Sequence, residues 1–279
     1  MKFANYTQFY RDREKHGIEY AAKHTLKLGF DSVEYFVCAP STALQTAKEE
    51  RAVLDRYGLD VACYSVSVQL FCNDPKQIEA QMLREVEAAA ILGAPYLHHT
   101  LCPNYIIDAK PQGYEEVFER IISSAEQIAR ACNQCGITCL YEPQGAYFNG
   151  VVGLDKIVTE LKRRGCKVGV CGDFGNSFFA DVDPCDVFDH FADQIRHVHI
   201  KDLLVTDQPI SERNVYFSAT GKPIYDVPVG NGSVDFAHGF RSLQQANYQG
   251  TISFETEGTD EALQKDLQYI KEIVLKIGL

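Results

Sequence analysis

The segment His197-Val198-His199-Ile200-Lys201-Asp202 reads as a short buried strand that carries imidazole, ammonium and carboxylate groups to one end. His197 and His199 are two residues apart, so their side chains face the same side of the strand. Three other apolar runs also end in an acid: Tyr141-Glu142, Cys171-Gly172-Asp173 and Ser253-Phe254-Glu255. Four strand ends that carry Glu, Asp, His and Glu, in chain order, predict a site for one hard divalent cation.

Strand-like and helix-like segments alternate on both sides of this stretch. We expect strands at residues 2–7, 32–36, 61–66, 96–100, 138–141, 168–171, 195–200 and 251–254. We expect helices at residues 18–28, 43–57, 74–92, 114–132, 154–164, 187–191, 236–246 and 261–277. This alternation predicts a parallel sheet covered by helices. Eight such units in 279 residues fit one α/β domain, a single (β/α)₈ TIM barrel over residues 1–279, with a doubly wound open sheet as the alternative.

Active sites of such barrels form at the carboxyl ends of the strands. Glu142, Asp173, His199 and Glu255 fall there, and so do Glu34 and His98. Glu257 is two residues beyond Glu255, so the register at the last strand leaves a choice between these two acids; Glu255 directly follows the apolar run and is preferred. The long stretch Leu203–Ser233 has no regular pattern, and we expect a functional loop there.

Composition argues against several classes of protein. The net charge of −11 disfavours nucleic acid as the main partner, because a phosphate backbone requires clustered Lys and Arg. No apolar run approaches the roughly 18 residues of a membrane span. The segment Met1–Tyr6 lacks the apolar core of a signal peptide. We therefore expect a cytoplasmic protein that uses neither a membrane nor a nucleic acid as partner.

The ten cysteines are expected to be reduced thiols. Cys132-Asn133-Gln134-Cys135 has the CxxC spacing of redox and zinc motifs, but no second CxxC or Cys–His pair accompanies it. It stands just before Gly136, at the predicted end of a helix. We interpret it as a helix terminus rather than a reactive site.

The order Glu, Asp, HxHxKD and Glu on eight strand–helix units resembles the xylose-isomerase-like barrel superfamily of sugar isomerases and epimerases. The resemblance spans essentially the whole chain, with supporting motifs at Gly29–Glu34 and at Val229–Asp235, which reads as a functional turn over the site. It implies that one divalent metal ion (Mn, Co, Mg or Zn) is held by Glu142, Asp173, His199 and Glu255. Glu142 and Glu255 would also be the catalytic acid/base pair on opposite faces of the substrate. The candidate substrate-binding residues are Glu34, His98, Asn176, His197 and Lys201.

The sequence departs from the ketose 3-epimerases of this family at three positions. Many relatives have Asp-x-x-His where this chain has Asp173-Phe174-Gly175-Asn176, and Asn176 cannot act as an acid or base. The Arg that usually follows the metal-binding His is replaced by Lys201-Asp202-Leu203. Glu142-Pro143-Gln144 lacks a second Glu. These departures weaken a free-ketose 3-epimerase but leave a metal-dependent sugar or polyol site intact.

The leading hypothesis is therefore an isomerase or epimerase that abstracts a proton next to the carbonyl of a small sugar, keto-sugar or polyol. The first alternative is a lyase or dehydratase on the same scaffold, of the inosose dehydratase or C-glycoside-cleaving type. The second is a non-catalytic sugar-binding barrel. The endonuclease branch of the superfamily is disfavoured, because its trinuclear zinc site is rich in His and this acidic chain has only eight. The resemblance also implies a homo-oligomer.

Overall fold

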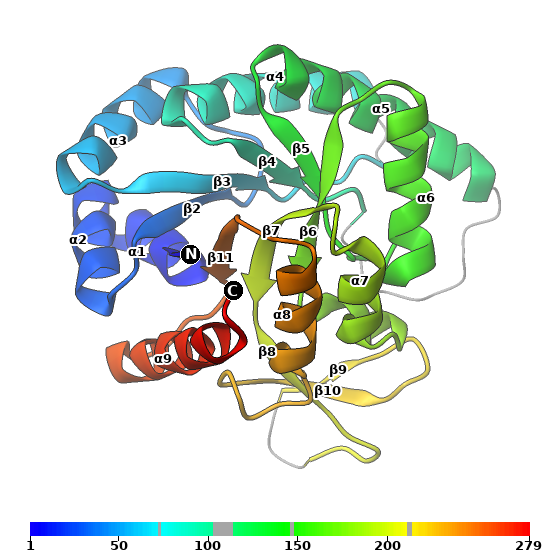
Figure 1. Ribbon diagram of the computed structural model, residues 1–279. Coiled ribbons are helices and arrows are strands. Elements are labelled where there is room, and N and C mark those ends of the chain that lie inside the picture. The colour runs from blue at the N-terminus through cyan, green and yellow to red at the C-terminus, as the bar shows by residue number, and fades with distance from the viewer. Residues whose placement is uncertain (72–73, 103–113, 146–147, 211–213) are drawn as a thin grey trace.

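Eight parallel strands close into a barrel in the computed structural model, which describes residues 1–71, 74–102, 114–145, 148–210 and 214–279 (Figure 1). The barrel strands are β1 (Lys2–Asn5), β2 (Ser32–Val37), β3 (Asp60–Val66), β4 (Tyr96–His99), β5 (Thr138–Tyr141), β6 (Val168–Asp173), β7 (Ile195–Ile200) and β11 (Thr251–Phe254). Their order around the barrel is β1-β11-β7-β6-β5-β4-β3-β2. The prediction of a (β/α)₈ barrel is confirmed, and the open sheet is excluded because β1 pairs with both β2 and β11.

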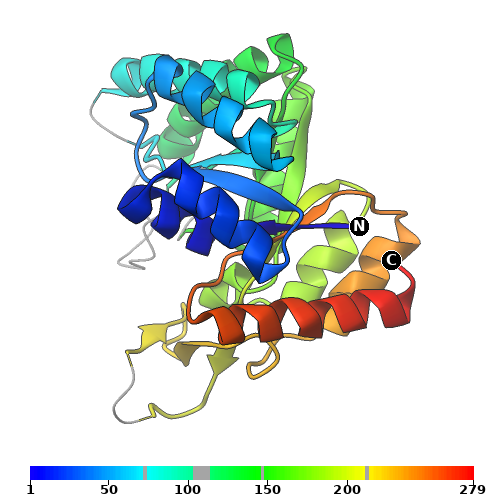
Figure 2. The same cartoon turned by 90° about the vertical axis from the view of Figure 1, so that its left-hand side faces the viewer.

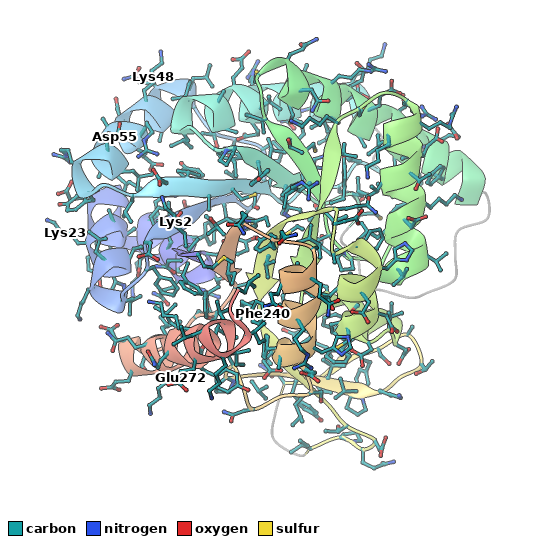
Figure 3. All side chains as sticks on the ribbon, viewed as in Figure 1. Lys2, Lys23, Lys48, Asp55, Phe240 and Glu272 are labelled. Carbon is teal, nitrogen blue, oxygen red and sulfur yellow. The ribbon has the colours of Figure 1, made fainter. Side chains whose placement is uncertain are left out.

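Helices surround the strands in a ring (Figure 1). They are α1 (Thr7–His16), α2 (Ile18–Leu28), α3 (Leu44–Tyr57), α4 (Pro75–Leu92), α5 (Tyr114–Gln134), α6 (Gly150–Arg163), α7 (Pro184–Phe191), α8 (Phe236–Gln245) and α9 (Asp260–Ile277). Each amphipathic helix buries one face against the barrel. Phe240 of α8 is fully buried, whereas Lys23, Lys48 and Glu272 are exposed on the outside of the ring (Figure 3). None of the helices among the described residues combines the length and hydrophobicity that a membrane crossing requires.

The expected first strand was too long, and a helix follows it. Residues 2–7 were predicted as a strand, but β1 ends at Asn5 and α1 begins at Thr7. Among the apolar side chains of α1 only Phe9 is buried, so the segment has little of the helical periodicity that a sequence pattern needs. Tertiary packing decides its conformation: the Asn5 side chain caps this region by accepting the Phe9 N–H at 3.2 Å.

The stretch Leu203–Ser233, predicted as irregular, contains a small antiparallel sheet. Its strands are β8 (Asp202–Val205), β10 (Pro223–Val227) and β9 (Tyr216–Phe217), in that order. It lies beside the amino-terminal part of α9, outside the barrel (Figure 2). A short 3₁₀ helix, η1 (Asn176–Ala180), also follows β6. The cysteines of the CxxC motif are free thiols at the carboxyl end of α5, Cys132 buried and Cys135 exposed.

Strand register determines which side chains meet at the carboxyl ends. Asp173 pairs with His199 across β6 and β7, and Ser253 pairs with His199 across β11 and β7. The register shifts between Val170 and Cys171 and between Val33 and Glu34. Such irregularities re-aim side chains beside active sites. Glu34 and Cys171, the residues that follow the two shifts, both lie close to His199.

Candidate metal centre

Three of the four predicted metal ligands lie around one atom of the fourth, Nδ1 of His199. Glu142 Oε2 lies 3.0 Å from it, Asp173 Oδ2 3.8 Å and Glu255 Oε2 3.9 Å. These residues come from the ends of four neighbouring strands, β5, β6, β7 and β11. The structure therefore brings together three carboxylates and one imidazole at the carboxyl end of the barrel.

Backbone hydrogen bonds place the outermost ligand. Glu255 follows β11, and its N–H donates to the Ile200 carbonyl at 2.8 Å, which extends the ladder between β11 and β7 by one residue. Glu257, the alternative acid in the sequence, forms an ion pair with Arg11 instead. The register choice is thus resolved in favour of Glu255 as the residue that faces His199.

The Asp173 side chain is fully buried, and hydrogen bonds offset the burial of only one of its two carboxylate oxygens. Its Oδ1 accepts hydrogen bonds from the N–H groups of Gly175 and Asn176, at 2.8 and 2.6 Å. Its Oδ2 lacks a hydrogen-bond donor within the described part of the chain and lies 3.2 Å from Lys201 Nζ. Burial raises the pKa of Asp173, with the Lys201 ammonium opposing this effect. Such a buried oxygen is a ready ligand for a cation.

The Lys201 ammonium lies between the carboxylates of Asp173 and Glu255. Its Nζ lies 2.6 Å from Glu255 Oε2 and donates to Asn176 Oδ1 at 3.0 Å. Burial raises the pKa of Glu255, which the positive charge of Lys201 limits. Lys201 and Asn176, both predicted substrate-binding residues, therefore border the ligand cluster on the side of Glu255.

A second layer of polar side chains lies beneath the cluster. Glu34 is fully buried and accepts from His197 Nε2 at 2.7 Å and from His199 Nε2 at 3.0 Å, as well as from the Ser65 hydroxyl. His98 Nδ1 lies 3.3 Å from Ser65 Oγ, and its Nε2 lies 3.4 Å from Glu142 Oε1. Burial lowers the pKa of His98 to about 4. The prediction that Glu34, His98 and His197 bind substrate stays a prediction.

The donor set fits a divalent cation. Glu142, Asp173 and Glu255 place negative charge around a single imidazole nitrogen, an arrangement typical of Mn, Mg, Co or Zn sites. Cys171 also lies within ligand distance of His199 and Glu142, but burial raises the pKa of its thiol to about 12. Carboxylate oxygen suits hard ions such as Mg and Mn, whereas sulfur ligands suit softer ions. The carboxylates are therefore the residues that would hold the ion with His199.

An open cavity of about 470 Å³ adjoins this cluster. Its lining includes Lys201 and Glu255 together with Arg11, Asp226 and Glu257. Arg11 was not expected from the sequence, because α1 itself was not predicted. Tyr6, just after β1, packs its ring 5.1 Å from that of His199 and covers the centre from the β1 side.

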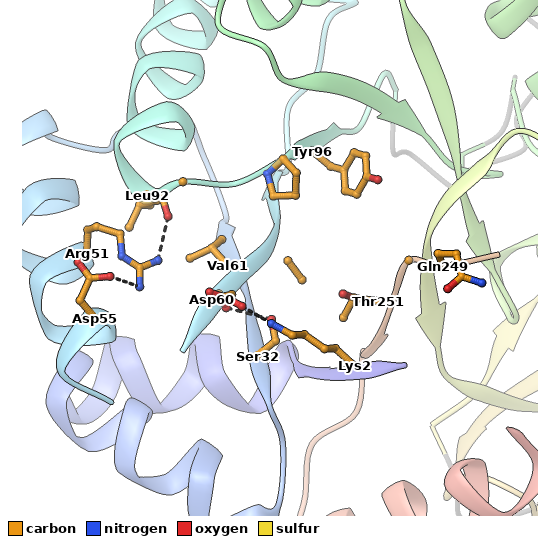
Figure 4. A pocket seen from close by; sticks show the side chains of 14 residues that line it. Lys2, Ser32, Arg51, Asp55, Asp60, Val61, Leu92, Tyr96, Gln249 and Thr251 are labelled. Atoms are coloured by element: carbon orange, nitrogen blue, oxygen red, sulfur yellow. Dashed lines mark hydrogen bonds and ion pairs between the residues drawn. The ribbon is translucent and has the colours of Figure 1, made fainter. Parts of the chain in front are cut away.

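A larger cavity of about 580 Å³ lies at the opposite, amino-terminal end of the strands (Figure 4). Its charged side chains compensate one another: Lys2 pairs with Asp60, and Arg51 pairs with Asp55 at 2.8 Å. Arg51 also donates to the Leu92 carbonyl at 3.0 Å. These pairs are partly exposed to solvent and contribute little to stability, and we assign no chemistry to them.

The Asp202 carboxylate organises the loop after β10. Its Oδ2 accepts from the N–H groups of Gly230 and Gly232 at 2.9 and 2.8 Å, and its Oδ1 accepts weakly from Val234 at 3.4 Å. The last residue of the HxHxKD segment thus binds the Val229–Asp235 motif. Asp202 was not among the predicted site residues. In the sequence, only the two glycines of Gly230-Asn231-Gly232 indicated that the backbone of this loop approaches another group closely.

Two curated relatives share limited sequence identity with the chain. An inosose dehydratase from Lacticaseibacillus casei is 23% identical over 215 residues, which cover 73% of this chain and 71% of the relative. An inosose dehydratase from Geobacillus kaustophilus is 24% identical over 241 residues, which cover 79% of this chain and 75% of the relative.

Solved structures share the same barrel at lower sequence identity. The apo form of a 3-keto-D-glucoside 4-epimerase from E. coli superposes with a TM-score of 0.74 at 19% identity, covering 98% of this chain and 99% of the other. A xylose isomerase-like TIM barrel protein from Mycobacterium smegmatis in complex with magnesium has a TM-score of 0.73 at 15% identity, covering 99% and 97%. A family model described as xylose isomerase-like TIM barrel matches residues 22–273. The chain belongs to the xylose isomerase-like TIM barrel family.

Proposed function

We propose that this protein is a divalent-metal-dependent dehydratase that removes water from a small, unphosphorylated keto-polyol. The observation that carries the proposal is the unequal exposure of its two candidate catalytic carboxylates. The Glu142 side chain is 4% exposed and lies against two histidines, whereas the Glu255 side chain is 30% exposed and borders the open cavity. The inosose dehydratases among its relatives support the same reaction class.

This asymmetry favours elimination over epimerisation. Epimerisation by two bases requires a carboxylate on each face of the substrate, both able to reach the same carbon. Elimination needs only one: Glu255 removes the proton next to the carbonyl and returns it to the β-hydroxyl on the same face. The electron pair of the broken C–H bond forms a carbon–carbon double bond, the bond between the β-carbon and the protonated hydroxyl breaks, and its oxygen leaves as one water molecule.

The remaining residues would bind and orient. Glu142, Asp173, His199 and Glu255 would hold the ion, which when bound polarises the substrate carbonyl and stabilises the negative charge developing on its oxygen. Lys201 and Asn176, beside Glu255, are placed to hydrogen-bond substrate hydroxyl groups.

The charges around the cavity support a neutral substrate. Its described lining includes five acids: Asp202, Asp226, Glu255, Glu257 and Asp266. Its two cations, Arg11 and Lys201, are each within ion-pair distance of a carboxylate. A phosphate group would meet net negative charge there, while a polyol can donate hydrogen bonds to these carboxylates. A cavity of about 470 Å³ is also of the size that holds small molecules.

Product mass tests the proposal. The Mn²⁺-loaded protein is incubated with an inosose in D₂O and the products are analysed by mass spectrometry. Loss of one water is the expected result, and Glu255→Gln should abolish it while the circular dichroism spectrum remains that of the folded protein. Turnover by Glu255→Gln at the wild-type rate would contradict the assigned base.

Epimerisation is the second candidate, because both Glu142 and Glu255 approach the same nitrogen of His199. It predicts a product that conserves the substrate skeleton and gains one deuterium from D₂O. A 3-keto-glucoside serves as the parallel substrate, since one structural neighbour is named for that reaction. Deuterium incorporation without loss of water, abolished in both Glu142→Gln and Glu255→Gln, would replace the dehydratase assignment.

A further inference from the structure

Three hydrogen-bond donors converge on the Glu34 carboxylate in the barrel interior. His197 Nε2 lies 2.7 Å from Oε2, His199 Nε2 lies 3.0 Å from Oε1 and 3.2 Å from Oε2, and the Ser65 hydroxyl donates to Oε1. The side chains of Glu34 and His197 are both fully buried. Glu34 therefore contacts the back of the metal centre and not the open cavity.

The direction of these hydrogen bonds determines where His199 carries its hydrogen. A carboxylate only accepts, so the Nε2 atom that faces Glu34 must be protonated. The other ring nitrogen, Nδ1, faces Glu142, Asp173 and Glu255, and it lies within hydrogen-bond distance of Glu142 Oε2, at 3.0 Å. A cation held by these carboxylates would take the place of a hydrogen on Nδ1, while Nε2 keeps its hydrogen toward Glu34.

We infer that Glu34 is a positioning residue that holds His199 in the Nε2–H tautomer and aims its Nδ1 at the metal ion. This inference rests on the proposed metal centre. Carboxylates that orient a ligating histidine from behind raise the basicity of its free nitrogen. His197 supports Glu34 from the other side and fixes the orientation of its carboxyl group.

The geometry favours a positioning role for Glu34 over direct contact with the substrate. Its side chain has no exposed surface, and both of its oxygens already accept hydrogen bonds. Glu34, His197 and His199 also form a group compact enough to hold a cation. Hydrogen bonds of 2.7 and 3.0 Å account for their spacing, however, and a cation there would compete for the same His199 ring.

Glu34→Gln tests the inference with little change of shape. Glutamine replaces one oxygen with an N–H donor, so at least one of the three converging donors loses its acceptor. We expect the affinity for Zn²⁺ or Mn²⁺, measured by calorimetric titration of the metal-free protein, to fall by about 10- to 100-fold. Ser65→Ala is the matched control, because it removes a donor to Glu34 without touching His199; its affinity should stay within about threefold of wild type.

The tautomer itself is measured by ¹⁵N NMR of the imidazole groups in the Zn²⁺-loaded wild type. A hydrogen on Nε2 of His199 supports the inference, and a hydrogen on Nδ1 overturns it even if Glu34→Gln fails to fold. Wild-type affinity in Glu34→Gln overturns it while leaving the metal centre and the proposed function intact. Failure of the wild type to bind any of these ions overturns both.

Discussion

Replacing Gly232 with alanine tests how the HxHxKD segment holds the neighbouring loop. An added Cβ would lie 2.0 Å from Asp202 Oδ1, 2.5 Å from its Cγ and 2.7 Å from the Leu203 carbonyl oxygen. Gly232 is not among the glycines with a left-handed backbone, so alanine is conformationally allowed there. The cost of the substitution therefore comes from the contact alone.

Relief of that contact requires the loop to move away from Asp202. The movement breaks the hydrogen bonds from Gly230 and Gly232 to Oδ2. Each bond to a charged acceptor contributes about 1.5–3 kcal/mol, and partial solvation of the loop favours the lower end. We expect Gly232→Ala to lower the free energy of unfolding by about 3 kcal/mol, a large share of the roughly 5–15 kcal/mol of a typical protein.

Urea unfolding followed by circular dichroism measures this loss. Gly221→Ala is the comparison, because Gly221 has φ +86° and nothing within 4 Å of its added Cβ; only backbone strain of about 1–2 kcal/mol applies. A double-mutant cycle with Asp202→Ala isolates the contact. If Gly232→Ala costs as much in the Asp202→Ala background as in wild type, the proposed contact is not the cause.

Three further predictions concern pH and metal binding. His24 donates to Asp12 at 2.6 Å and to Asp260 at 2.9 Å, and these hydrogen bonds outweigh burial and raise its pKa above 6.5. Its contribution to stability is therefore complete below pH 6.5 and is lost as the pH rises through the folded-state pKa. In urea unfolding, His24→Gln should remove this pH dependence from the free energy of unfolding. Burial raises the pKa of Asp266 from 3.8 to about 6, so stability falls as the pH rises through this interval. Asp266→Asn should then gain about 1–2 kcal/mol at pH 7, and a loss of stability would contradict the assignment. Mn²⁺ at about one hundred times its Kd should stabilise the wild type by about 2.7 kcal/mol in thermal unfolding, and equal stabilisation of His199→Ala would argue against this ligand.

Much of the barrel could be predicted because its strands are short apolar runs with sharp ends. The predicted limits of β5, β7 and β11 coincide with those in the structure. By contrast, α1 escaped prediction because Phe9 is its only buried apolar residue. The β8–β10 sheet also escaped prediction, since both residues of β9 are exposed and its pairing joins separate segments.

The candidate metal centre could be located in part for the same reason. Acids placed directly after apolar runs, such as Glu142 and Glu255, must lie at one edge of a parallel barrel. The partners of those acids depend on register and bulges, which a linear sequence does not specify. The contacts of Glu34 illustrate this: its place on a strand was predictable, whereas its bonds to His197 and Ser65 arise from residues on β7 and β3.

The pairing of β1 with β11 has a consequence for biosynthesis. β1 is the first strand to be translated, and its partner β11 is the last strand in chain order. Because Lys2 pairs with Thr251, one edge of β1 stays unpaired until β11 has been translated. Glu255 follows β11 and is therefore the last of the four candidate ligands to be translated. A nascent chain cannot present the complete set of candidate ligands before β11 has been translated, so metal binding by this set would follow translation of the whole barrel.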